Sequence, residues 1–124
     1  MSDSVDQVGS DPLFFEVVDE AGVLAWVGPV RLFTANVSCN GNSATAWLQI
    51  FDSATVLGAD IGGTDPVWSI PIPAGAVWDS PWTKPISFSN GIVLACTSTA
   101  TGSSAPSGDA TVNISIQSDG LLNG

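Results

Sequence analysis

The stretch FTANVSCNGNSATAWLQIF, residues 33–51, decides the fold class. From Phe33 to Cys39, apolar side chains alternate with polar ones at a period of two, which is typical of a half-buried β-strand. The NGNS sequence of residues 40–43 has the composition of a turn. Residues Thr45–Phe51 then predict a second strand, with large apolar side chains on both faces. We therefore expect both faces of this second strand to be partly buried.

Outward from this hairpin, the same short alternating segments recur along the chain. Residues Gly91–Ser98 are apolar on both faces, as expected for a central strand. Pro71 and Pro73 lack the backbone N–H of a sheet ladder, so we expect their strand to lie at an edge or to be irregular. Including these two, further strands are predicted at Leu13–Val18, Val23–Val27, Val67–Pro73, Pro85–Ser89, Gly91–Ser98 and Ala110–Gln117.

Helices of useful length are not expected. Apolar residues do not recur at alternating spacings of three and four, and 13 glycines and 8 prolines interrupt the chain. About eight short strands separated by turn signals indicate an all-β protein. We expect an antiparallel β-sandwich of jelly-roll type, or an open barrel.

The composition limits the classes of partner. The 124 residues fit one domain, and 44% of them are hydrophobic, which argues against general disorder. Only 11% are charged, and the net charge is −10. Arg31 and Lys84 are the only cations of the chain. We therefore expect no binding to nucleic acid, whose phosphates require many cations, and none to anionic membranes.

Acidic residues are concentrated at the N-terminus. We interpret residues 1–12 as an acidic arm and residues 13–124 as a single β-sandwich domain. The arm is either a solvated tail or a segment that becomes ordered on a neighbouring subunit. The second alternative is attractive because Phe14 and Phe15 follow directly and favour burial. We therefore expect these two phenylalanines to contribute to an interface.

The cysteines are expected to be reduced. No apolar run approaches the 18 residues of a membrane span, and the N-terminus has the opposite character to a secretory signal. Synthesis in the cytoplasm of a host cell is therefore expected, and thiols in a cytoplasm stay reduced. Cys39 and Cys96 lie on apolar faces of their strands, which predicts two buried thiols. A disulfide would require their strands to be neighbours.

Residues suited to catalysis or metal binding are scarce. The chain has no histidine, and Lys84 stands alone between Thr83 and Pro85. The loop from Asp60 to Asp65 offers two carboxylates among glycines, but its spacing matches no calcium motif. We expect no catalytic residue, no metal and no cofactor, and we do not expect an enzyme. The acids after residue 20 are interpreted as turn formers: Asp52, Asp60, Asp65, Asp79, Asp109 and Asp119.

Five tryptophans are many for a chain of this length. Trp68 lies on an alternating face and is expected in the core. Trp78 and Trp82 flank residues 79–81, DSP, which we predict to be a turn. These two rings have three possible roles: a lid over the open end of the sandwich, an anchor in a protein interface, or a platform for stacking a sugar.

Three segments carry a resemblance to a known family. In order, they are LQIFDSA at residues 48–54, DPVWSIPIPAG at 65–75 and ISFSNGIVLA at 86–95, followed by a loop and a last alternating strand at 109–116. Together they resemble a pattern found in virion structural proteins of tailed bacteriophages, over about residues 33–117. The resemblance implies a small, usually oligomeric β-sandwich that serves as a head decoration (cement) protein or as part of a tail or fibre. It implies no catalytic residues.

The resemblance and the charge together give a functional expectation. A protein with a net charge of −10 is repelled by packaged DNA, so the outer surface of the capsid suits it better. We expect a capsid decoration protein that binds the major capsid protein as a homo-oligomer, most plausibly a trimer. It would stabilise the joints between capsomers. The alternative is a tail or fibre module that binds host glycans through Trp78 and Trp82.

Overall fold

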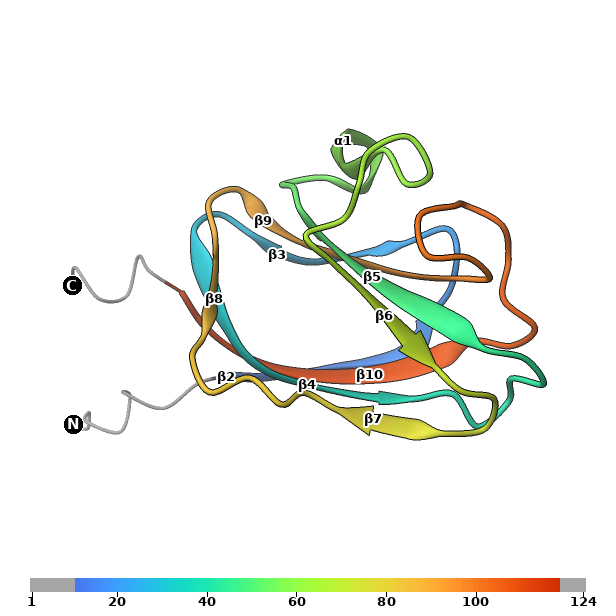
Figure 1. Ribbon diagram of the computed structural model, residues 1–124. Helices are drawn as coiled ribbons and strands as arrows, with labels where there is room; N and C mark the ends of the chain where they lie inside the picture. Colours follow the sequence, from blue (N-terminus) through green and yellow to red (C-terminus); the bar gives the residue numbers. More distant parts are fainter. Residues whose placement is uncertain (1–10, 119–124) are drawn as a thin grey trace.

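The strands of this protein form two antiparallel sheets that pack face to face as a β-sandwich (Figure 1). The computed structural model describes residues 11–118, which contain nine strands and one short helix. The first sheet contains β2 (Asp11–Val18), β10 (Ala110–Ser118), β4 (Val30–Ser38) and β7 (Val77–Asp79) in this order, and β8 (Ile86–Phe88) also pairs with β4. The second sheet contains, in order, β3 (Val23–Val27), β9 (Gly91–Thr97), β5 (Ala46–Asp52) and β6 (Trp68–Ile72).

The pairing of the strands is nested along the chain. The first described strand, β2, pairs with the last, β10, and β3 pairs with β9. Further in, β4 pairs with both β7 and β8, and β5 pairs with β6. Two additional pairings, β4 with β10 and β5 with β9, complete the sheets. Every connection except β5–β6 and β7–β8 therefore passes from one sheet to the other.

The core lies between the sheets and follows the predicted alternation except at Phe33. There the pairing of β4 with β10 shifts register, so Leu32 is buried and Phe33 lies outside the core cluster. All seven residues of β9 are buried, and β9 lies between β3 and β5, so the expectation of a central strand is confirmed. Both faces of β5 are largely buried, as predicted. β6, which contains Pro71, is an edge strand, also as predicted. The largest fully buried side chains include Phe88, Leu32, Leu48 and Ile50.

Two short elements differ from the sequence prediction. Val77–Asp79 forms β7, although a turn was predicted at residues 79–81. Val56–Ala59 forms the helix α1, which begins after Thr55, whose side chain accepts a hydrogen bond from the backbone N–H of Gly58. Three or four residues are too few to show a period, so no sequence pattern distinguishes such elements from loops.

Two residues of the predicted acidic arm lie within the described part of the chain. β2 begins at Asp11, so Asp11 and Pro12 belong to a strand of the sandwich. The rest of the predicted acidic arm, residues 1–10, lies outside the described residues, as does Asp119.

We predict that Gly91 is essential for the crossing between β8 and β9. Its φ of 153° favours glycine, and an added Cβ would collide with the carbonyl oxygens of Trp26 and Ser53. Gly91→Ala should therefore lower the free energy of unfolding by about 2–4 kcal/mol, measured by urea denaturation. Gly41→Ala is the matched control, because its Cβ would meet no atom within 4 Å, and its effect should stay within about 0.5 kcal/mol. Equal stabilities of the two variants would contradict this account.

Candidate functional site

The outer face of the second sheet is covered by the chain itself. The segment around α1 folds over this face and forms a second, smaller apolar cluster. Further along the face, the buried Gln49 donates from Nε2 to the hydroxyl of Thr97 at 2.7 Å and to the carbonyl of Gly102 at 3.0 Å. These bonds hold the β9–β10 loop against the sheet. The members of the smaller cluster are Phe51, Ala59, Val93 and Ala95, with Val56 and Ile61 packed against them.

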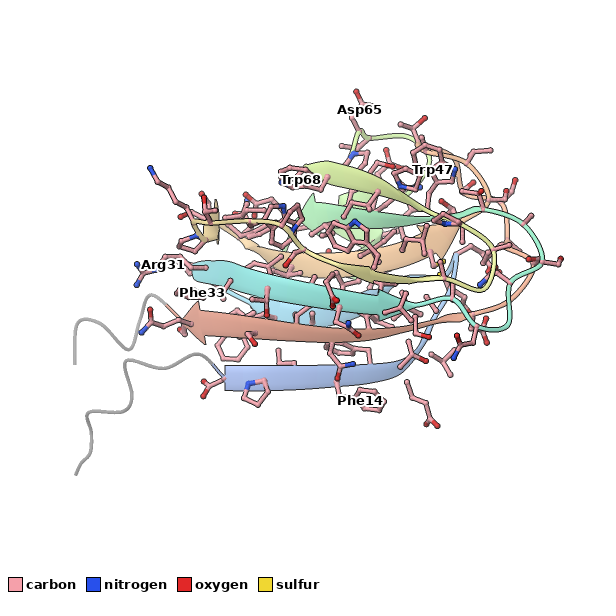
Figure 2. All side chains as sticks on the ribbon, turned by 60° about the horizontal axis from the view of Figure 1, so that its bottom comes forward. Phe14, Arg31, Phe33, Trp47, Asp65 and Trp68 are labelled. Carbon is pink, nitrogen blue, oxygen red and sulfur yellow. The ribbon has the colours of Figure 1, made fainter. Side chains whose placement is uncertain are left out.

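The outer face of the first sheet, in contrast, is open. Figure 2 brings β2, β10 and β4 to the front, with Phe14 projecting from β2. Cross-strand register aligns the outward side chains in rows. One row runs Phe14, Asn113, Asn36 and Asp79, and the next runs Pro12, Ser115 and Thr34. We refer to the surface formed by these two rows as the open face.

A shallow hollow of about 320 Å³ lies on the open face. Its lining includes uncharged residues of both rows, and Phe14 at its margin is 61% exposed. Amides and hydroxyls offer hydrogen-bond donors and acceptors there without a net charge. The hollow therefore suits a neutral polar or mildly apolar surface. The row residues in its lining are Pro12, Phe14, Thr34, Asn36, Asn113 and Ser115.

Charged groups lie at the margins of the open face. The Asn36 amide donates a hydrogen bond to the carboxylate of Asp79 on β7. At the start of β4, the Arg31 guanidinium donates from Nη2 to Oε1 of Gln117 at 3.0 Å. Figure 2 shows Arg31 at the end of the strand, away from Phe14. The centre of the open face is therefore uncharged, although the chain carries a net charge of −10.

The two phenylalanines predicted for an interface lie on opposite faces of β2. Phe14 is opposite Asn113 on the open face. Phe15 is opposite Val112, faces inward and packs against the core. Since neighbouring residues of a strand point to opposite sides, only one of the two can reach a partner from this face.

Three of the five tryptophans gather at the other edge of the sandwich. Trp78 is opposite the buried Val37, and both Trp78 and Trp82 pack against the core. The ring of Trp82 lies 5.9 Å from that of Trp78 and 5.5 Å from that of Trp68, measured between centroids. This arrangement corresponds most closely to a lid over the gap between β6 and β7. β10 and β4 separate β7 from β2, so the tryptophans and Phe14 do not form one site.

The expectation that Trp68 lies in the core is wrong. Its side chain is 40% exposed, whereas Ile70 and Ile72 on the same strand are buried. Trp68 is the first residue of the edge strand β6, where the sheet ends and no further strand covers it. The alternation was read correctly, but it does not show where along a strand the core stops.

The acidic residues mostly shape turns. The carboxylate of Asp52 accepts the backbone N–H groups of Ser89 at 3.1 Å and Asn90 at 2.9 Å, which fixes the β8–β9 turn. Asp60 ends α1 in the left-handed conformation, and its carboxylate accepts the Thr64 hydroxyl at 3.4 Å. Within residues 11–118, no three His, Cys, Asp or Glu side chains come together as metal ligands would.

No family model matches the chain, and neither the curated proteins nor the solved structures contain a match. In the described part of the chain, no helix is both long enough and apolar enough to span a membrane.

The lid role of the tryptophans can be tested by stability. Trp78→Ala should lower the free energy of unfolding by about 3 kcal/mol, because it uncovers the core beside Val37. Trp68→Ala should cost less, about 1 kcal/mol, because 40% of its side chain is already exposed at the end of the edge strand. Urea denaturation of each variant measures both values. A stability unchanged by Trp78→Ala would show that this ring is not a lid.

Proposed function

We propose that this chain is a capsid decoration (cement) protein of a tailed bacteriophage. It binds the outer surface of the head as a homo-oligomer and stabilises the joints between capsomers. One observation carries the proposal: the protein covers one sheet with its own loops and leaves the other as an open, centrally uncharged face. The sequence resemblance of residues 33–117 to virion structural proteins supplies the class of assembly.

The nested pairing supports a jelly-roll topology within the sandwich. A jelly roll is a long antiparallel hairpin rolled into two sheets, so its first strand pairs with its last and its second with the one before. The pairs β2–β10, β3–β9, β4 with β7 and β8, and β5–β6 follow this scheme. Jelly rolls are common in viral capsid proteins and also in lectins. The topology therefore agrees with a virion protein but does not by itself distinguish a decoration protein from a glycan binder.

The distribution of charge favours contact between copies through the open face. Two chains with a net charge of −10 repel each other, and this repulsion is smallest when uncharged surfaces meet at the contact. The rows around Phe14 and Asn113 provide such a surface. We propose a trimer, in which the open face of each copy packs against a different surface of the next copy, as closed rings of three require.

The acidic groups away from this face would then meet the shell. They suit basic patches on the major capsid protein, which we propose as the second partner. The acidic arm, followed by Phe14, would act as a clasp. Phe15, which was expected to share this role, packs inward and is no longer part of it.

A glycan-binding tail or fibre module is the second candidate. The hollow favours it, because Phe14 stands opposite Asn113 and Asn36 follows in the same row, and an aromatic ring with neutral hydrogen-bonding groups suits a sugar. For this second candidate function, the glycan would bind at the open face. Trp78 and Trp82, proposed for this role from the sequence, pack against the core.

A charge placed on the open face tests the proposal. Phe14→Glu adds an acid within the proposed contact, and Leu57→Glu adds the same charge on α1, where the side chain is 90% exposed. Light scattering should show a trimer for the unmodified chain and for Leu57→Glu, and a monomer for Phe14→Glu. Occupancy on undecorated heads should fall at least tenfold for Phe14→Glu alone.

Two results would overturn the proposal. One is a monomer that persists at high concentration and does not bind undecorated heads. The other is equal behaviour of the two glutamate variants. Binding on a glycan array that is lost in Phe14→Glu, together with a monomeric unmodified chain, would support the second candidate instead.

A further inference from the structure

The two cysteines of the chain meet in the core. Cys39 directly follows β4 of the first sheet, and Cys96 lies in β9 of the second sheet. Both side chains are completely buried in the same apolar cluster. Both are free thiols, and they form a hydrogen bond with each other. This contact therefore joins the two sheets through side chains that the proposed function does not use.

The backbone holds both cysteines at the same end of the sandwich. The N–H of Cys39 donates to the carbonyl of Ala76 at 2.9 Å, and the N–H of Cys96 donates to the carbonyl of Asp19 at 3.0 Å. β5 begins beside the end of β9, where Trp47 is opposite Thr97. The β4–β5 turn and the end of β9 therefore lie together, and the thiols are held in contact by two anchored strands.

We propose that Cys39 and Cys96 are a redox-active pair that a low-molecular-weight disulfide converts into a disulfide bond between the two sheets. The inference rests on their burial, their contact and their positions on opposite sheets. It does not depend on the proposed function. Two thiols already in contact need little movement to reach the spacing of a disulfide.

The chemistry is an exchange between thiols and a disulfide. The hydrogen bond from Cys96 lowers the pKa of Cys39, while the same bond and burial raise the pKa of Cys96. Either thiol can react first when the end of the sandwich opens, and the steps are the same with the two cysteines exchanged. When Cys39 reacts first, it loses its proton and attacks as a thiolate. Its sulfur forms a bond to one sulfur of the small disulfide and releases the other half as a thiolate. Cys96 then loses its proton and attacks the Cys39 sulfur, which releases the second half.

The net reaction converts two protein thiols and one small disulfide into a protein disulfide and two small thiols. Such a bond would close a loop from residue 39 to residue 96, nearly half of the chain. A cross-link of this span restricts the unfolded chain and stabilises the fold. The pair would be reduced during synthesis in a cytoplasm and become oxidised in an extracellular setting.

The test uses the full chain in buffers with a graded ratio of oxidised to reduced glutathione. Each sample is prepared twice, from folded protein and by refolding from urea, so slow access to buried thiols cannot hide the equilibrium. After acid quenching and alkylation, mass spectrometry should show an unalkylated monomer two mass units lighter than the reduced chain. Its melting temperature should rise by roughly 10 °C and return to the reduced value with excess dithiothreitol.

Cys39→Ala and Cys96→Ala serve as matched controls, since each leaves one thiol. Neither should show the rise in melting temperature. Three outcomes would overturn the proposal: two alkylated thiols at the most oxidising ratio, accumulation of glutathione adducts, or disulfide-linked dimers. If an alanine variant fails to fold, the mass of the unmodified chain alone still decides the question.

Discussion

The packing of inward side chains between β4 and β10 on one side and β5 and β9 on the other determines the rest of the structure. Side chains of a strand alternate, so fixing the buried set also fixes the outward set. A slip of one residue would bury Asn113 and Asn36 and expose Ile114 and Ala35. The rows of the open face are therefore a consequence of the core, and no contact among the outward residues is needed to align them.

Loop placement makes the two outer faces different. The long β5–β6 and β9–β10 connections both leave strands of the second sheet, and both return over its outer face. In contrast, the β7–β8 connection runs along the edge of the first sheet, because both strands pair with β4. The open face is thus a consequence of the topology. Because its centre carries no charge, it is the surface on which this acidic chain would meet least electrostatic repulsion from another acidic chain.

The sequence predicted the sandwich well because alternation and turn residues are local signals. It located the strands that became β4, β5, β9 and β10 and the edge position of β6. It missed β7 and α1, which are too short for a period to repeat along them, and it placed Trp68 in the core because alternation does not reveal where a sheet ends. For the candidate site, the sequence predicted the residues that could take part but not which of them face outward. Phe14 and Phe15 are both apolar, so only the pairing with β10 shows which one points outward.

The open face and the cysteine pair are linked through β4. This strand supplies Thr34 and Asn36 to the open face, and it ends beside Cys39, which contacts Cys96 on the other sheet. A covalent bond at this point would fix β4 to β9 without changing any outward side chain. A surface that binds by matching fixed rows loses less conformational entropy on binding when the rows are already rigid. Oxidation of the buried pair would therefore strengthen the binding that we propose for the open face, although the cysteines do not touch that face.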